Sequence, residues 1–150
     1  MTHIRWSYFA VTVFALLGAT CAAAQEQAVT QNGISFVSGG VGADSEERLK
    51  AQEKDFNLKL VLTLIEGNYV SGVDVVVKNA AGSTLVEHTA EGPFFMAKLP
   101  AGKYTVAATY SSKSQTRKFA IGGKGLHTEY LRWPSDPKTD FTLPPEGTNK

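Results

Sequence analysis

Hydrophobic and polar residues alternate along most of the chain after residue 57. One face of the stretch NLKLVLTLIEG carries four leucines, Leu58, Leu60, Leu62 and Leu64. Alternation with a period of two predicts a β-strand. Because Val61 and Ile65 make the opposite face partly apolar, we expect this strand to be central or covered on both sides.

Six further stretches alternate in the same way between turn signals rich in Gly, Pro, Asn and Ser. They cover residues 73–77, 85–89, 94–99, 104–110, 116–121 and 126–133. About seven short strands with a turn signal every eight to twelve residues are typical of an antiparallel, immunoglobulin-like β-sandwich. We therefore predict a mainly β fold in which two sheets bury their alternating residues against each other.

An acidic, helix-like segment precedes the first of these strands. Asp44 followed by Glu47 fits a capping box, which predicts one short helix from about Ser45 to Glu53. Upstream, Gln25–Asn32 is polar and without period, as in a flexible lead. Ile34–Val37 is a short apolar patch that fits an edge strand.

The glycine-rich stretch SGGVGADSEE joins these two parts of the chain. A P-loop places a lysine and a hydroxyl directly after its last glycine, whereas Gly42 is followed by Ala43 and Asp44. The acidic residues at the start of the predicted helix would also repel a phosphate. We therefore interpret the stretch as a bend that turns the N-terminal segment onto the sandwich.

The two ends of the chain differ in composition from the middle. Arg5, an apolar run and the small residues Ala22–Ala24 predict a secretory signal peptide cleaved between Ala24 and Gln25. The apolar run is shorter than the roughly 20 residues that span a bilayer, so we expect no membrane insertion after cleavage. The predicted organisation is a signal peptide at 1–24, a lead with a glycine-rich turn and a helix at 25–57, a sandwich at 58–133, and a disordered tail at 134–150.

Charge and cysteine content exclude several classes of function. The single cysteine, Cys21, leaves with the signal peptide, so the exported protein has no disulfide or thiolate site. The 15 Lys and Arg residues nearly balance the 14 Asp and Glu residues. A near-neutral chain argues against a nucleic-acid-binding protein and against a polybasic membrane anchor.

A strand–turn–strand motif lies in LPAGKYTV, with its defining residues at Leu99, Pro100, Gly102, Tyr104 and Val106. It resembles the signature of carboxypeptidase regulatory-like domains, which are transthyretin-like or prealbumin-like sandwiches, and the resemblance covers about 58–133. It implies a small proteobacterial secreted protein whose domain has no catalytic residues. In this motif Pro100 fixes φ, Gly102 allows a positive φ, and the Tyr104 hydroxyl is expected to bond to the backbone.

Few residues offer catalytic or metal-binding chemistry. His88 and His127 are the only histidines after the signal, and Glu129 shares a predicted strand face with His127. These three residues form a metal site only if their strands are neighbours, because metals usually take three or four ordered ligands. The chain lacks a G-x-S-x-G elbow and ends in PPEGTNK rather than the Tyr-Arg-Gly-Ser of transthyretin-like hydrolases. We predict no catalytic, cofactor-binding or metal-binding residue, and no enzyme.

Aromatic residues are more numerous than one sandwich face requires. Phe94 and Phe95 are adjacent in a strand, so they point to opposite faces. Either one of them lies under the helix or the N-terminal segment, or it belongs to an exposed patch. We assign an interaction surface to Phe94, Phe95, Tyr130 and Trp133.

These observations predict a non-enzymatic module in the periplasm or at the cell surface. Its expected partner is an unknown envelope protein or polymer, bound by a sheet face or by strand addition at an edge. A carbohydrate- or small-ligand-binding domain that uses surface aromatics is the alternative, and an exposed cluster of aromatics would favour it. A hydrolase is the third hypothesis.

Overall fold

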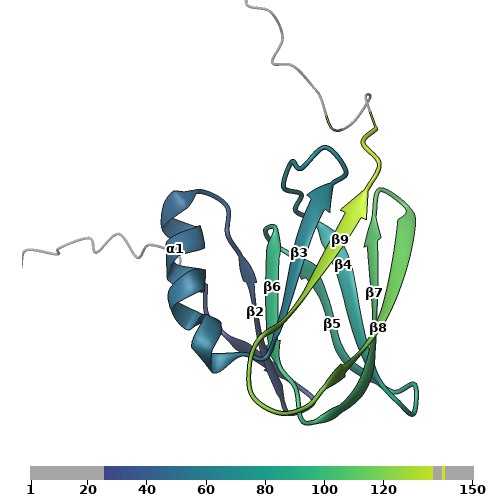
Figure 1. The fold of residues 1–150 in the computed structure, drawn as a ribbon. Helices are drawn as coiled ribbons and strands as arrows, with labels where there is room; N and C mark the ends of the chain where they lie inside the picture. Colours follow the sequence, from purple (N-terminus) through teal and green to yellow (C-terminus); the bar gives the residue numbers. More distant parts are fainter. Residues whose placement is uncertain (1–25, 137–139, 141–150) are drawn as a thin grey trace, which may run out of the picture.

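The computed structural model describes residues 26–136 and residue 140, which form a mainly β structure with one α-helix (Figure 1). The predicted signal peptide and most of the predicted disordered tail lie outside the described residues. The strands are β1 (Val29–Gln31), β2 (Ile34–Gly39), β3 (Leu58–Leu64), β4 (Val73–Asn79), β5 (Thr84–Ala90), β6 (Phe94–Lys98), β7 (Gly102–Tyr110), β8 (Lys113–Ile121) and β9 (His127–Trp133). Helix α1 spans Ala43–Gln52, and a 3-10 turn, η1, spans Glu53–Asp55.

The strands form two sheets. The first has five strands in the order β1-β2-β6-β3-β9, and the second has four in the order β5-β4-β7-β8. All pairings are antiparallel except that of β3 with β9, which is parallel from Leu58↔His127 to Leu64↔Trp133. The prediction of a wholly antiparallel sandwich was therefore wrong at this pair. Parallel neighbours need a long crossover, and here the intervening strands supply it.

All seven predicted strands are present, and β1 and β2 raise the number within the described residues to nine. β2 includes the apolar patch Ile34–Val37, which we expected to be an edge strand, and β1 lies in the polar stretch that we interpreted as a flexible lead. β1 is short and largely exposed, and β2 is buried on both faces, so neither shows a clean alternation. β2 is no edge strand, because it pairs with β1 on one side and β6 on the other.

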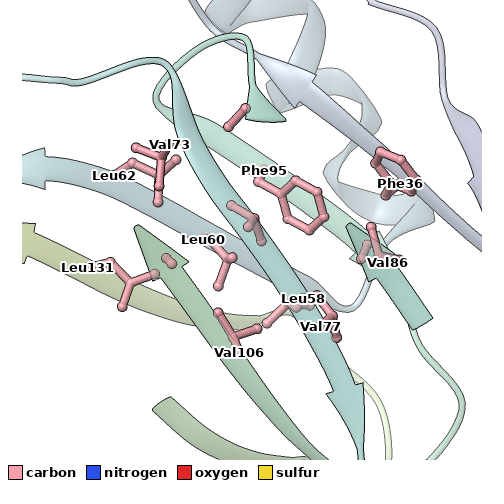
Figure 2. Packing of buried hydrophobic residues seen from close by; sticks show 14 of the residues in the cluster. Phe36, Leu58, Leu60, Leu62, Val73, Val77, Val86, Phe95, Val106 and Leu131 are labelled. Atoms are coloured by element: carbon pink, nitrogen blue, oxygen red, sulfur yellow. The ribbon is translucent and has the colours of Figure 1, made fainter. Parts of the chain in front are cut away.

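The main hydrophobic core lies between the two sheets (Figure 2). The four leucines of β3 face it and are at most 3% exposed, as the alternation predicted. Phe36 of β2 and Phe95 of β6 stack in this core with their ring centroids 5.5 Å apart. Val77 and Val106 face the same core from the second sheet, on the side of Leu58 (Figure 2).

A second, smaller cluster lies on the outer face of the first sheet, where α1 covers β2 and β6 (Figure 1). Leu49 of α1 packs there with Val37, Met96 and Phe94. The helix is short and few of its residues are buried. It covers only part of the sheet and leaves the outer face of β3 and β9 open.

The glycine-rich stretch forms the predicted bend between β2 and α1. Gly40 and Gly42 have φ values of 93° and 86°, in the left-handed region that favours glycine. The capping box was wrong, because the helix begins earlier, with Gly42 as N-cap and no side-chain cap. The hydroxyl of Ser45 instead accepts a hydrogen bond from the Gly40 N–H at 2.8 Å, which holds the bend against the helix.

The turn before β7 is held by the tyrosine of the sequence motif. The Tyr104 hydroxyl donates to the Pro100 carbonyl at 2.6 Å, which confirms the predicted bond to the backbone. Gly102 does not take a positive φ, contrary to our prediction, and it begins β7 as an extended residue. The tyrosine therefore closes this turn without help from a left-handed glycine.

Two tyrosines that pack against the core, the buried Tyr104 and the half-buried Tyr110, make stability sensitive to high pH. Burial raises the pKa of Tyr104. The pKa of Tyr110 is also raised, mainly by burial and in addition by the hydrogen bond to Asp140. A phenol whose pKa is higher in the folded than in the unfolded chain contributes stability that is present below the unfolded value of about 10 and is lost as pH rises through the folded value. We expect the urea midpoint to fall above about pH 10. In the double variant Y104F/Y110F this fall should be smaller, and an equally steep fall would contradict the assignment.

Candidate functional site

A groove of about 510 Å³ lies on the outer face of the first sheet, beside α1. Its floor and walls come from β3, β9, the start of β6, α1, η1 and the loop after β3. The lining residues are Glu46, Glu53, Lys59, Val61, Thr63, Ile65, Gly67, Tyr69, Phe94, Leu126, Thr128, Tyr130 and Arg132.

The parallel pairing of β3 with β9 builds this groove. Because the leucines of β3 face the core, Lys59, Val61 and Thr63 must face outward. The register places Tyr130 opposite Val61 and Arg132 opposite Thr63. Side chains from two strands far apart in the sequence therefore share one surface.

Phe94 forms the apolar wall of the groove where it meets the helix. Its ring is only 5% exposed and contacts Tyr69 edge-to-face at 5.3 Å. The Lys59 ammonium lies 4.7 Å from the centre of the Phe94 ring and is also paired with Glu53. The wall is thus held in place by an aromatic contact, a cation–π contact and an ion pair.

The open part of the groove carries exposed apolar and aromatic side chains. Ile65, Tyr69 and Tyr130 are 62%, 55% and 54% exposed. They are three of the five large hydrophobic residues that are exposed in the described part of the chain. The Arg132 guanidinium lies 5.6 Å from the centre of the Tyr130 ring and covers one of its faces. Such a concentration of Tyr and Arg on one face is typical of an interaction site.

The structure corrects the predicted interaction surface. Tyr130 lies in the groove and is exposed, but Phe95 and Trp133 are fully buried in the core and Phe94 is nearly so. Phe95 and Trp133 face the second sheet, and the Trp133 Nε1–H donates to the Lys113 carbonyl at 2.8 Å. Phe94 faces the other way, as alternation requires. Its ring is covered by Tyr69 and Lys59 on the groove side and by Gly40 of the glycine bend.

Sequence reasoning missed the other residues of the groove. Tyr69 follows the Gly67-Asn68 turn and bridges back to Thr63, which brings its ring over Phe94. Arg132 lies two residues after Tyr130, so the period of two placed both on one face. The sequence pattern did not show that β9 lies beside β3. It also did not show that α1 leaves the outer face of these two strands uncovered.

Two sheet edges are occupied by side chains of the opposite sheet. At β5, the Glu87 N–H donates to Gln31 Oε1 at 2.7 Å, and Asn32 Nδ2 donates to the Leu85 carbonyl at 3.0 Å. At β9, Gln115 Nε2 donates to the Arg132 carbonyl. These contacts satisfy backbone groups that a partner strand would need, so they favour binding at the sheet face over strand addition at β5 or β9.

Ser38 and His88 form a pair that the sequence did not indicate. Ser38 Oγ lies 2.9 Å from His88 Nε2 and also accepts a hydrogen bond from the Glu91 N–H. A hydrolytic triad needs an acid that orients the imidazole, and no carboxylate bonded to His88 is found within the described residues. Ser38 is buried, and the pair ties β2 to β5 across the two sheets.

Of the three candidate metal ligands, His127 and Glu129 come together but His88 lies elsewhere. His127 Nε2 lies 2.8 Å from Glu129 Oε1 on β9, and the His127 ring stacks on Phe119 with centroids 5.2 Å apart. His88 belongs to β5, at the opposite edge of the second sheet from β8. Within residues 26–136 and 140, no group of three or more His, Cys, Asp or Glu side chains is arranged to hold a metal ion.

No protein-family model matches this chain, and no curated protein matches it significantly. Among the described residues, no helix has both the length and the apolar character needed to cross a membrane.

Proposed function

We propose that this protein is a non-enzymatic binding module outside the cytoplasm and that the groove over β3 and β9 is its binding site. The observation that carries the proposal is the grouping of Ile65, Tyr69 and Tyr130, all exposed, around one groove. Exposing large apolar side chains to water is unfavourable, so their grouping on one face favours a partner that covers them. The N-terminal sequence supports export, and the resemblance to carboxypeptidase regulatory-like, prealbumin-like domains supports a role without catalysis.

A segment of an envelope protein is the partner that the groove fits best. Sugar-binding sites offer open aromatic faces for stacking, but Lys59 covers Phe94 and Arg132 covers Tyr130 here. Tyr and Arg, together with Trp, are enriched among the residues that contribute most to protein–protein binding. The groove also carries both signs of charge, with Glu46 and Glu53 near Lys59 and Arg132, which suits a peptide better than a neutral glycan.

A carbohydrate or small ligand is the second candidate, and the grouped aromatics are the observation that favours it. The groove volume falls within the range of about 300–1,000 Å³ found for small-molecule sites. The hydroxyls of Thr63 and Thr128 would bond to ligand hydroxyls. The two candidates predict different results. If the ligand is a carbohydrate, this protein should be retained on isolated cell-wall polysaccharide, and no protein partner should be captured.

In-cell crosslinking of the tagged protein, followed by mass spectrometry, tests the proposal. We expect a reproducible envelope protein to be captured, and the double variant Y130A/R132A to reduce its capture at least tenfold, because two hot-spot residues each contribute about 1–2 kcal/mol or more. The control variant V29A/K113A removes an exposed apolar side chain and an exposed cation elsewhere, and should leave capture unchanged. Both variants should melt at the temperature of the parent protein.

Either of two results would contradict this function. Unchanged capture by Y130A/R132A would place the interface outside the groove. Turnover of a substrate that is lost on His127→Ala or Ser38→Ala would show an enzyme instead.

A further inference from the structure

A second surface stands out because charge is distributed unevenly along the chain. Residues 92–128 contain no Asp or Glu but six basic residues, Lys98, Lys103, Lys113, Arg117, Lys118 and Lys124. The whole chain has a formal net charge of only +1, so acidic residues are concentrated elsewhere. This basic segment supplies β7 and β8, half of the second sheet.

Three lysines meet on the outer face of that sheet, and we infer that this face binds a carboxylate-bearing polysaccharide. Lys78 of β4 is opposite Thr105 of β7, and Thr105 is opposite Lys118 of β8. Lys103 lies two residues before Thr105 and so points to the same side. Neighbouring strands are about 4.8 Å apart, which places the backbones of Lys78 and Lys118 about 10 Å from each other.

The lysines have no ion-pair partner within the described residues. The ion pairs found there join Arg48 to Glu26, Lys59 to Glu53 and His127 to Glu129. Two carboxylates share this outer face, both toward the β5 side of the sheet. Asp74 accepts a hydrogen bond from the Thr89 hydroxyl at 2.6 Å, and Glu87 of β5 is opposite Val76. Lys103 is diagonal to Lys78 and Lys118 across neighbouring strands, so the three like charges repel one another through space. An anionic ligand that lies across Lys78, Lys103 and Lys118 would remove that repulsion.

The other groups on this face indicate the kind of anion. Thr105 lies between Lys78 and Lys118, and Thr116 lies two residues before Lys118 on the same side of β8. The hydroxyls of these two threonines suit the hydroxyls of a sugar. A hollow of about 410 Å³ adjoins Lys103 and Lys118 and reaches Tyr104 and Phe119.

Two other polyanions fit this face less well. The exposed large hydrophobics of the described chain, Val29, Val41, Ile65, Tyr69 and Tyr130, all lie on the first sheet or its loops. The lysine face therefore offers no apolar side chain to insert into a membrane and no exposed aromatic ring for stacking on a nucleic-acid base. These observations favour a polysaccharide.

This surface does not depend on the groove. The two outer faces lie on opposite sides of the sandwich, with α1 beside the first sheet and β7 and β8 in the second (Figure 1). A protein that binds a polypeptide with one face and an acidic polymer with the other would hold that polypeptide near the polymer.

Affinity for polygalacturonate, with dextran as the neutral polymer, tests the inference on the purified protein expressed from the full chain. We expect binding to polygalacturonate that weakens at least tenfold between about 50 and 200 mM salt, because lysine contacts to a polyanion are screened and release counterions. Dextran should not bind. The triple variant K78Q/K103Q/K118Q should lose at least tenfold in affinity for polygalacturonate.

A second triple variant, K50Q/K54Q/K98Q, removes the same charge from other exposed positions and should bind within twofold of the parent protein. Equal losses in both triple variants would overturn the inference, because net charge alone would then explain binding. It would also be overturned by equal binding to dextran, by tighter binding to duplex DNA or to anionic vesicles than to polygalacturonate, or by no binding at all. The groove variant Y130A/R132A should bind polygalacturonate normally, so the two proposals fail separately.

Discussion

Replacing Phe95 by alanine is expected to lower the free energy of unfolding by about 3–5 kcal/mol, the usual range for a buried aromatic ring. The side chain is fully buried and stacks on Phe36. Alanine would remove the ring and leave a cavity among Phe36, Leu60 and Val86, which approach it from three other strands (Figure 2). Because β-strands hold these neighbours in place, the cavity would close only in part. Urea unfolding followed by tryptophan fluorescence measures this loss.

Tyr130→Ala is the matched control for Phe95→Ala. Both residues were assigned to the same interaction surface from the sequence, but Tyr130 is 54% exposed and packs mainly against Arg132. We expect its replacement to change stability by less than about 1 kcal/mol, as for most surface substitutions, while weakening partner capture. If the two variants lost the same stability, the burial of Phe95 would be contradicted.

The contrast between these two residues shows how far alternation predicts this fold. A period of two identified all seven strands between residues 58 and 133 and correctly placed Phe94 and Phe95 on opposite faces. It left open whether the outer face of β6 is covered by the helix or exposed, because that depends on α1, which packs on this face from another part of the chain. Local patterns indicate which side of a strand is apolar but not what lies against it.

Strand order was equally beyond the sequence pattern. β9 reads as one more amphipathic strand, and nothing in its own residues indicates a parallel neighbour. That pairing determines the candidate site, since it brings Tyr130 and Arg132 beside Val61 and Thr63. Tyr104 shows the opposite case, because its bond to Pro100 spans four residues and so could be predicted from a local motif.

Replacing Gly92 by alanine is expected to destabilise the protein by about 3 kcal/mol, at the upper end of the range for overpacking. A Cβ atom at this position would lie 2.2 Å from the Gly39 carbonyl oxygen and 2.4 Å from its carbon. These are backbone atoms at the end of β2, so no side-chain rotation can relieve the contact. β2 would have to move away from the start of β6, where Gly39 is paired with Phe94. Because Phe94 forms a wall of the groove, capture of the envelope partner should also decrease.

Gly122→Ala provides the comparison that isolates this effect. Gly122 also lacks a positive φ, but a Cβ atom there would meet no atom within 4 Å. Its replacement should be neutral or stabilise by about 0.4–1 kcal/mol, because alanine has fewer conformations to lose on folding. The two variants add the same methyl group, so any difference between their urea midpoints measures the close contact between Gly92 and Gly39. Equal midpoints would contradict the close approach of the glycine bend to β6, and with it the position of Phe94 in the groove.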